Sequence, residues 1–399
     1  MASGNTRTGW IVVAVGFVGL ALCFAYRNLL QVTMTSMEAD LGWSRSLLSS
    51  GATLALITMA AGNLFGGMLV DRYGPRKLLS FGMASLGFGM LGAGMVQAPW
   101  QYVLVFGLFA GLGFGLVATS VVSAAIARFF VERRGFAMGV ATAGGPFGQM
   151  TLIPIAAIVL SNFGWRSLFT AFGLLAIALA PVAYWMLRPT QAPAGTAKLT
   201  LASIGADFSY LVRSPTFHLL FWGFFICGFT SIGVIETHFI PYAVLCGFGP
   251  TTSANAFGVL SVLNLAGILL AGWLADRMNR VLLLAGIYAA RGLTFIMLLA
   301  ITDNPAMLFA FSALYGLFDY ATIAVVASLV ASHLGLRVMG FAIGLMGMSH
   351  QLGAAAGAIG GGVVFDLYNS YTGLWMMSLV LALVAAALSI VIKPQPKAA

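Results

Sequence analysis

The stretch GGMLVDRYGPRK, residues 66–77, is a charged connection between two long apolar segments, and a shorter copy of it occurs later in the chain. The copy is GWLADR, residues 272–277, in which the Gly, Asp and Arg stand 205 positions after their counterparts. The same offset relates GFAMG at residues 135–139 to GFAIG at residues 340–344. Because one constant offset serves widely separated places, we predict that the chain is a tandem duplication of a single unit.

Around these copies the sequence is too apolar for a water-soluble protein. Of its 399 residues, 60% are hydrophobic and 7% are charged, whereas soluble domains carry about 25% charged residues. The apolar runs are continuous over about 20 residues, the length of a membrane-spanning helix, and lack the alternation of a β-barrel strand. The predicted fold class is therefore an all-α membrane protein with twelve transmembrane helices. We expect them near residues 10–36, 46–70, 78–97, 100–127, 136–160, 165–187, 217–243, 252–274, 281–301, 306–332, 340–364 and 372–392.

The positive charges predict the orientation of these helices. Fifteen of the nineteen Lys and Arg residues fall on the side of the membrane that carries both termini. Because cytoplasmic loops are enriched in Lys and Arg, we expect both termini in the cytoplasm and the protein in the inner membrane of a bacterium. The net charge of +9 then belongs to a rim that faces anionic lipid, and it does not indicate binding to nucleic acid.

The longest connection, residues 188–216, divides the predicted helices six and six. We therefore expect an N-terminal six-helix bundle at residues 1–187, a cytoplasmic linker at 188–216 and a C-terminal six-helix bundle at 217–399. Within the linker, apolar residues at helical spacing predict a short amphipathic helix on the membrane surface. Two copies with six spans each enter the membrane in the same direction, so a pseudo-twofold axis along the membrane normal should relate them around a central site.

GGMLVDRYGPRK resembles the signature loop between helices 2 and 3 of the major facilitator superfamily, Gly-x-x-x-Asp-Arg-x-Gly-x-Arg-Lys. GWLADR has the corresponding place between helices 8 and 9, and the resemblance covers the whole chain. It implies the major facilitator fold and secondary active transport, in which two six-helix bundles rock around a site at the membrane midplane. It also implies that helices 1, 2, 4, 5, 7, 8, 10 and 11 line the cavity.

The two loops carry the candidate gating residues. A carboxylate at a helix end accepts hydrogen bonds from the amides of a neighbouring helix, and a glycine allows two helices to approach closely. A latch of this kind would bias the equilibrium between two orientations of the bundles, whereas the alternative is that the charges only anchor the topology. The candidate residues are Gly67, Asp71, Arg72, Arg76, Asp276 and Arg277.

Ionisable side chains inside the spans cost about 2.5 to 3.5 kcal/mol each to insert, so each calls for a partner or a function. Arg27 on helix 1 could hold a substrate carboxylate in a bidentate manner, or extend to the outer headgroups. Arg291 and Asp319 lie at equal depth on helices 9 and 10, and we expect them to pair. Either this pair is structural, or Asp319 exchanges a proton during transport and Arg291 tunes its proton affinity.

Helices 7 and 11 offer further ionisable candidates. His350 and Gln351 lie near the centre of helix 11. Imidazole titrates near neutral pH, so His350 could bind substrate or a proton, or be a hydrogen-bonded core residue. Glu236 and His238 stand two residues apart on helix 7, so they should face different directions unless the helix unwinds. Both are proton-coupling candidates.

Three uncharged polar side chains, Gln149, Asn264 and Tyr320, complete the candidate substrate site. The sequence GGPFG at residues 144–148 is expected to interrupt helix 5 and to free backbone groups, which membrane depth tolerates only against protein or a wet cavity. This segment partly resembles the Gly-Pro motif of drug/proton antiporters. Efflux of hydrophobic or toxic compounds is therefore the alternative function.

Several stretches resemble the bacterial monocarboxylate and oxalate/formate carrier group, among them LGWSRS at 41–46, THFIPYA at 237–243 and SHQLGAAAGA at 349–358. This resemblance implies transport of a small carboxylate, either together with protons or by exchange, and we expect proton coupling here. Asn264 and Ile268 stand where animal-type carriers have Asp and Arg, which leaves Arg27 as the main carboxylate anchor. We expect a monomer with a small-molecule substrate, protons and lipid as partners, and no cofactor, metal or enzymatic activity.

Overall fold

The computed structural model describes residues 6–130, 134–187, 201–302, 304–335 and 337–393, apart from the side chains at positions 6, 67, 71, 134 and 201–204. These residues are mostly helical and contain no strand, which confirms the all-α membrane fold. The first half of the chain forms α1 (Thr6–Arg27), α2 (Leu29–Leu41), α3 (Arg45–Gly94), α4 (Pro99–Leu104), the π-helix η1 (Val105–Ala110), α5 (Gly111–Leu116), α6 (Thr119–Ala127), α7 (Arg134–Thr142) and α8 (Gly144–Met186).

The second half repeats a similar succession of long and broken helices. It forms α9 (Leu201–Val212), α10 (Pro215–Gly228), the π-helix η2 (Phe229–Ile235), α11 (Glu236–Leu245), α12 (Pro250–Ala275), α13 (Arg280–Leu299), α14 (Pro305–Asp319), α15 (Ala321–Leu334), α16 (Met339–Tyr368) and α17 (Thr372–Ile390).

Two glycines divide the longest elements. Gly74 in α3 and Gly164 in α8 have φ angles of 76° and 78°, a conformation that only glycine adopts without strain, and each joins two helices. Nine segments of the described residues are long and apolar enough to cross a membrane. With the 30-residue α16 and the parts of α3 and α8 that follow these glycines, the described helices are consistent with the twelve spans that the apolar runs predict.

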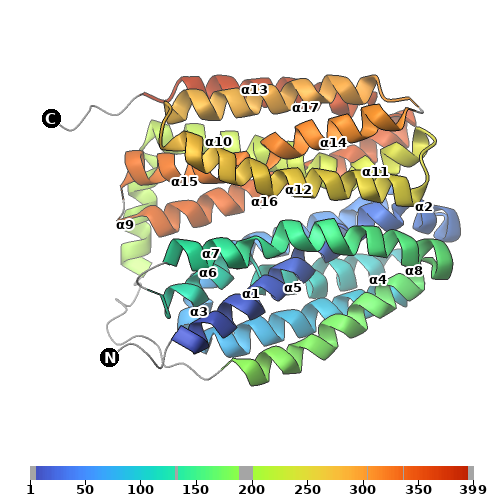
Figure 1. The fold of residues 1–399 in the computed structure, drawn as a ribbon, viewed down its shortest axis with the longest axis horizontal. Helices are drawn as coiled ribbons and strands as arrows, with labels where there is room; N and C mark the ends of the chain where they lie inside the picture. Colours follow the sequence, from blue (N-terminus) through green and yellow to red (C-terminus); the bar gives the residue numbers. More distant parts are fainter. Residues whose placement is uncertain (1–5, 131–133, 188–200, 303, 336, 394–399) are drawn as a thin grey trace.

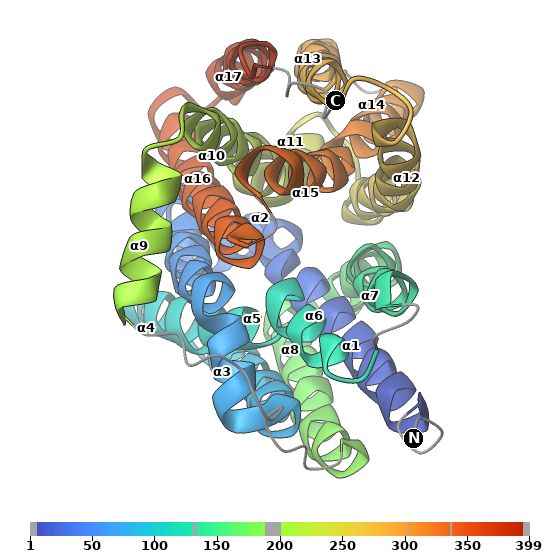
Figure 2. The same ribbon diagram turned by 90° about the vertical axis from the view of Figure 1, so that its left-hand side faces the viewer.

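Figure 1 shows the long helices lying side by side, with the start of α1 and the end of α17 at the same end of the molecule. We call this the terminal end, and the opposite end, where α2 finishes and α4 begins, the distal end. In Figure 2 the helices α1 to α8 group together below, and α10 to α17 group together above. The two groups meet where α3 contacts α16 and where α8 contacts α12. The central site that the duplication predicts falls between these two pairs of helices.

The internal duplication is visible in how the helices pack. Gly148 of α8 lies so close to α1 that a Cβ there would collide with the carbonyl oxygen of Ala21. Gly353 of α16, 205 positions later, lies equally close to the carbonyl oxygen of Phe225 in α10. Glycine at both positions allows the close helix approach that membrane proteins favour. Equivalent helices of the two halves are thus paired in the same way.

The interruption expected at residues 144–148 is smaller than predicted. α7 and α8 are separated only by Ala143, whose N–H donates to Gly139 at 3.0 Å and whose carbonyl accepts from Phe147 at 3.1 Å. The predicted interruption is limited to this turn, where α7 ends and α8 begins and where Pro146 has no N–H to donate to the Thr142 carbonyl. The helices are interrupted elsewhere, at Asn28, at the π-helices η1 and η2, and at Tyr320.

The amphipathic helix predicted for the linker is α9, which crosses the terminal end beside both groups of helices (Figure 2). Asp207 on α9 accepts a hydrogen bond from Arg337 at 2.6 Å, in the connection between α15 and α16. Residues 188–200 of the predicted linker lie outside the described residues. The domain boundaries predicted from the sequence stay predictions.

Candidate functional site

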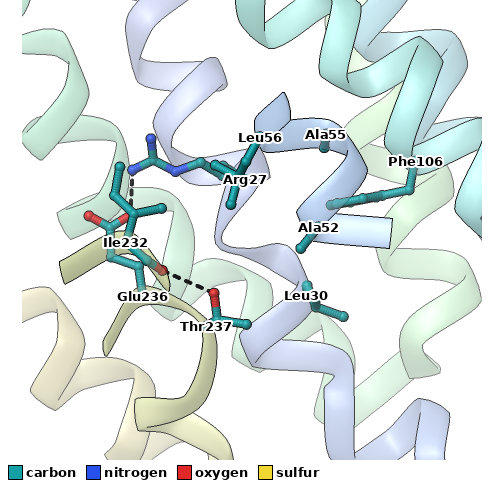
Figure 3. A pocket seen from close by; sticks show the side chains of 9 residues that line it. All are labelled: Arg27, Leu30, Ala52, Ala55, Leu56, Phe106, Ile232, Glu236 and Thr237. Atoms are coloured by element: carbon teal, nitrogen blue, oxygen red, sulfur yellow. Dashed lines mark hydrogen bonds and ion pairs between the residues drawn. The ribbon is translucent and has the colours of Figure 1, made fainter. Parts of the chain in front are cut away.

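An ion pair between Arg27 and Glu236 joins the two halves at the centre of the molecule (Figure 3). Both residues are buried, with 8% and 4% of their surface exposed. Asn28 donates to the same carboxylate at 3.3 Å, and the Tyr320 hydroxyl donates to its other oxygen at 2.7 Å. The carboxylate of Glu236 is therefore held by three side chains, from α1, from the α1–α2 break and from the α14–α15 break.

The local backbone explains why these two charges can be placed here. Arg27 is the last residue of α1, where a cation interacts favourably with the helix dipole, and Glu236 is the first residue of α11, where an anion does. The π-helix η2 immediately precedes Glu236. Such π-bulges are frequent at functional sites because they redirect side chains out of the regular helical register.

This contact corrects the sequence-based interpretation of Arg27. The guanidinium points between the halves rather than toward headgroups, and it is not a free cation, because Glu236 neutralises it in this conformation. The prediction that Glu236 and His238 face different directions is confirmed. The His238 ring lies 2.9 Å from the Ala358 carbonyl and 3.2 Å from the Tyr371 hydroxyl, on the other side of α11.

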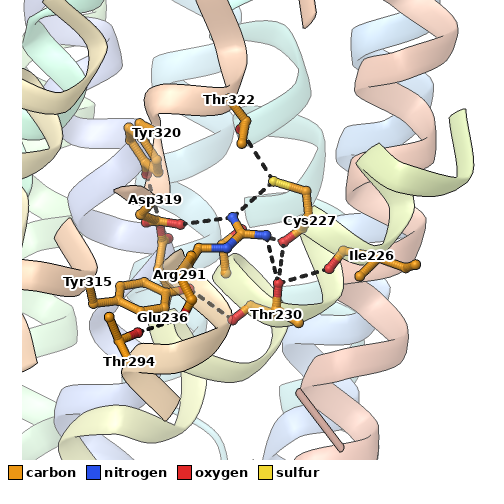
Figure 4. Close-up of polar contacts among 11 residues, drawn as sticks. Ile226, Cys227, Thr230, Glu236, Arg291, Thr294, Tyr315, Asp319, Tyr320 and Thr322 are labelled. Carbon is orange, nitrogen blue, oxygen red and sulfur yellow. Dashed lines mark hydrogen bonds and ion pairs between the residues drawn. The ribbon is translucent and has the colours of Figure 1, made fainter. Parts of the chain in front are cut away.

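A second group of buried polar side chains lies next to the Arg27 and Glu236 ion pair, inside the second half (Figure 4). Arg291 and Asp319 are fully buried and 3.7 Å apart, which confirms that they pair. Arg291 also donates to the Cys227 sulfur at 3.1 Å and to the Thr230 hydroxyl at 3.0 Å. Because Asp319 precedes Tyr320 directly, one break in the chain connects this cluster to the Arg27 and Glu236 pair.

The remaining predicted site residues lie on α8, α12 and α16. Asn264 of α12 is fully buried, and neither of its amide atoms has a hydrogen-bond partner among the described residues. Gln149 of α8 is also fully buried, and neither of its amide atoms has a hydrogen-bond partner among the described residues. Gln351 is 6% exposed, whereas the centre of the His350 ring lies 4.7 Å from the centre of the Phe224 ring on α10, with the two rings tilted by 49°. Their predicted roles in substrate binding stay predictions.

Beside the central ion pair lies a small, mostly apolar pocket (Figure 3). The space at its centre is about 10 Å³, roughly what a single water molecule needs. This conformation is therefore closed around the site. The pocket is lined by Arg27, Leu30, Ala52, Ala55, Leu56, Phe106, Ile232, Glu236 and Thr237.

At the distal end, a contact that the sequence interpretation missed joins the two halves. Asp366 of α16 accepts the backbone N–H groups of Arg45 and Ser46, both at 3.0 Å, and so caps the first turn of α3. The Arg45 side chain is 3% exposed and lies 3.6 Å from the centre of the Phe365 ring. It also donates to the Tyr371 hydroxyl at 2.9 Å. We call these five residues the distal latch.

One signal for this latch was present in the sequence. Arg45 follows the N-cap Ser44 and stands in the first turn of α3, which contains no acidic residue. A cation at that position opposes the helix dipole, so a carboxylate from elsewhere in the chain was to be expected nearby. Asp366 and Glu38 supply it, the latter through an ion pair with Arg45 at 3.0 Å.

The family model of the Major Facilitator Superfamily matches residues 16–358 and 247–399. The chain belongs to the Major Facilitator Superfamily. It is 27% identical to the uncharacterized MFS-type transporter YcxA of Bacillus subtilis, over 98% of this chain and 96% of that protein. It is 25% identical to monocarboxylate transporter 13 of Rattus norvegicus, over 93% and 85% of the two chains. Monocarboxylate transporter 11 of Homo sapiens is 26% identical, over 93% and 80%.

Solved transporter structures share the superfamily fold. The nucleoside transporter NupG, solved as a mutant, superimposes with a TM-score of 0.79 over 96% of this chain and 100% of its own, at 15% identity. A bacterial homologue of the lysosomal transporter Spinster superimposes with a TM-score of 0.74 over 96% of each chain, also at 15% identity. Identities this low establish the fold alone.

The superfamily loop motif lies at the terminal end. Arg76 donates to the Tyr184 carbonyl at 2.8 Å, and Arg277 donates to the Trp273 carbonyl at 3.1 Å, so each contacts its own half. Arg72 is exposed beside Tyr73. Asp276 is the C-cap of α12, and the side chains at positions 67 and 71 lie outside the described residues. The gating role of this loop stays a prediction.

The hydrogen bonds that join the two superfamily halves lie between the central ion pair and the distal end. Among the side chains that the structure describes, the hydrogen bonds between the halves are those of Arg27 and Asn28 with Glu236, those of the distal latch, and that of Thr53 with the Ala355 carbonyl at 3.2 Å. The structure is thus closed at the distal end.

Proposed function

We propose that this chain is a secondary active transporter that carries a small organic anion together with protons across a bacterial inner membrane by alternating access. Two of the relatives above are named monocarboxylate transporters. The observation that carries the proposal is the buried Arg27, whose guanidinium lies between the halves and has an exchangeable carboxylate partner in Glu236. An organic carboxylate presents the same chemical group to Arg27 as Glu236 does.

The proposed coupling follows from competition for one cation. While Glu236 is charged, it occupies Arg27, and an incoming anion would leave the buried site with an excess of negative charge. When Glu236 takes up a proton, it becomes neutral and Arg27 is free to bind the substrate carboxylate. Tyr320 and Asn28 keep the Glu236 side chain in place during this exchange. One proton then accompanies one monovalent anion, so the loaded site has the same net charge as the empty one.

Other parts of the chain receive supporting roles in this proposal. The pair of Arg291 and Asp319 stabilises the second half beside Tyr320, and Asp319 is the second proton-coupling candidate. Gln149 and Asn264 offer polar groups to the substrate. The loops at 66–77 and 272–277 act as gates at the terminal end, which faces the cytoplasm. The transporter acts as a monomer.

The test is uptake of radiolabelled pyruvate into proteoliposomes with an inward proton gradient. We expect Arg27→Gln to abolish uptake. We expect Glu236→Gln to abolish gradient-driven accumulation but to retain exchange of labelled for unlabelled pyruvate, because a neutral residue 236 leaves Arg27 free to bind. The matched control is Arg166→Gln, at a partly exposed distal arginine that contacts only its own half.

Full uptake by the Arg27→Gln protein would overturn the proposal. Transport of a hydrophobic cation such as ethidium, without uptake of any carboxylate, would instead support the drug exporter that the Gly-Pro segment predicts as the alternative. Unchanged accumulation in the Glu236→Gln protein would reject Glu236 as the proton site and leave Asp319 as the remaining candidate.

A further inference from the structure

The π-helix η2 leads directly into the proposed coupling carboxylate. It covers Phe229–Ile235, and the N–H of the next residue, Glu236, donates to the Ser231 carbonyl five residues back. Such bonds define π winding, whereas an α-helix bonds four residues back. Because each residue turns an α-helix by about 100°, the winding of this segment decides the direction in which Glu236 leaves the helix. The contacts that hold η2 therefore bear on the ion pair with Arg27.

Thr230, near the start of η2, is the residue at which two other helices hold this segment (Figure 4). It is fully buried. The Arg291 guanidinium of α13 donates to its hydroxyl at 3.0 Å, and the Tyr315 hydroxyl of α14 donates to its backbone carbonyl, also at 3.0 Å. The Thr230 hydroxyl itself donates to the Ile226 carbonyl at 2.9 Å, which leaves its lone pairs for Arg291. The side chain and the backbone of Thr230 are thus fixed from two directions.

The same helix, α14, also contacts the far end of this segment. Tyr320 is the C-cap of α14, five residues after Tyr315, and its hydroxyl donates to the Glu236 carboxylate at 2.7 Å. One tyrosine therefore binds the backbone where η2 begins, and the other binds the side chain that follows η2. The Tyr320 contact ends at a side chain that can rotate, so it does not fix the winding of η2. The Tyr315 contact restrains the backbone itself.

The ring and the hydroxyl of Tyr315 have separate contacts. The ring is fully buried, and its centre lies 5.8 Å from that of Phe295 and 5.4 Å from that of Phe311. The hydroxyl donates to the Thr230 carbonyl. A phenylalanine at position 315 would keep the ring contacts and remove this hydrogen bond. A bond of this kind corresponds to about a 2- to 12-fold change in an equilibrium constant.

We propose that Tyr315 is a positioning residue for Glu236. Its hydrogen bond to the Thr230 carbonyl keeps η2 in the π form, and this form directs the Glu236 carboxylate at Arg27. Arg291 assists by binding the Thr230 hydroxyl. The inference rests on the proposed function, because it needs Glu236 as the group that competes with the substrate for Arg27. It adds to that function the residue on which this competition, and hence the coupling to protons, depends.

Loss of the Tyr315 hydroxyl should uncouple transport without blocking it. When η2 changes its winding, Glu236 turns away and Arg27 is free to bind pyruvate. In proteoliposomes, the Tyr315→Phe protein should exchange labelled for unlabelled pyruvate with a KM about 2- to 12-fold below that of the parent protein. The maximal rate of exchange should be unchanged, and accumulation driven by a proton gradient should fall in the same proportion as KM. A merely structural defect would instead lower the maximal rate or raise KM.

A double variant tests whether Tyr315 acts through Glu236. On the Glu236→Gln background, Tyr315→Phe should have no further effect on exchange, because the group that it positions is already neutral. Should the Tyr315→Phe protein not fold, Thr230→Val decides the same question by the same KM measurement, because it removes the hydroxyl that Arg291 binds.

The matched control is Tyr242→Phe. Tyr242 lies on α11, the helix that begins at Glu236, and its hydroxyl donates to the Leu298 carbonyl of α13. The substitution therefore removes the same kind of hydrogen bond in the same half of the chain, but at a position beyond η2. It should leave both KM and accumulation unchanged.

A parental KM in the Tyr315→Phe protein, an equal loss of exchange and accumulation, or a further effect on the Glu236→Gln background would overturn the positioning role. These results would leave Arg27 as anchor and Glu236 as proton site. The proposed function fails in a different way. In that case the Arg27→Gln or the Glu236→Gln protein accumulates pyruvate as the parent does, and the positioning role is rejected with it.

Discussion

Replacing Asp366 with Asn should loosen the distal latch. The two Asp366 carboxylate oxygens accept the N–H groups of Arg45 and Ser46, both at 3.0 Å, and thereby fasten α16 of the second half to α3 of the first. An Asn side chain has one acceptor oxygen and presents an NH2 group to the other donor. Charge-assisted hydrogen bonds contribute about 1.5 to 3 kcal/mol. Because Asp366 is an exposed residue, solvent screening reduces this contribution, and we take about 1 to 2 kcal/mol.

A change of this size shifts an equilibrium about 5- to 30-fold. The distal-open conformation should therefore gain population by that factor relative to the closed one. Met95 and Tyr368 are 75% and 72% exposed and lie at the distal ends of α3 and α16. Spin labels attached to cysteines at these two positions report the separation of the halves by double electron–electron resonance. Cys246 is first replaced by Ser, because it is the least buried of the three cysteines.

The matched control is Asp40→Asn. Asp40 is another distal carboxylate, but it accepts a hydrogen bond from Trp165 at 3.1 Å and contacts Arg166, both within the first half. We expect this variant to leave the distance distribution unchanged. If Asp366→Asn gives the same distribution as the parent protein, the latch does not hold the distal end closed and the reasoning from its hydrogen bonds is wrong.

Three further outcomes are expected. Burial raises the pKa of Asp366, but hydrogen bonds from Ser46 and Arg45 outweigh this effect and hold the pKa below its usual value. The charged carboxylate therefore stabilises the latch at every pH above the ordinary pKa of an aspartate. The same spin labels should report opening only as the pH falls through the lowered pKa. Arg291→Met should destabilise the protein by about 3 to 5 kcal/mol, because it leaves Asp319 buried without its partner. Adding Asp319→Asn to the same chain should recover part of this loss. Denaturant unfolding in detergent measures the free energy of unfolding of both proteins, and strictly additive losses would contradict the pairing. Gly148→Ala should cost about 1 to 3 kcal/mol in the same assay, because the added Cβ collides with the Ala21 carbonyl, whereas Gly139→Ala, which meets open space on the same span, should cost nothing.

The sequence predicted the pair of Arg291 and Asp319 but not the pair of Arg27 and Glu236. The first two residues lie at equal depth on consecutive helices, and depth can be read from position along an apolar run. The second pair is separated by 209 residues and joins different halves. Whether two such side chains meet depends on how each helix is rotated about its axis, and the irregular backbone at η2, which sets the direction of Glu236, left no clear signal in composition.

The amino-acid sequence by itself determined that the chain crosses a membrane with several apolar helices, that its two halves repeat, and that a few charges lie within hydrocarbon. These properties follow from the length and polarity of each segment, because lipid excludes unpaired polar groups wherever they occur along a helix. Only the tertiary structure decided which of the buried polar groups contact each other. Contacts such as that of Gly148 with Ala21 pack together helices that are far apart in the chain. This packing brings Glu236 to Arg27, and it brings Asp366 to the first turn of α3.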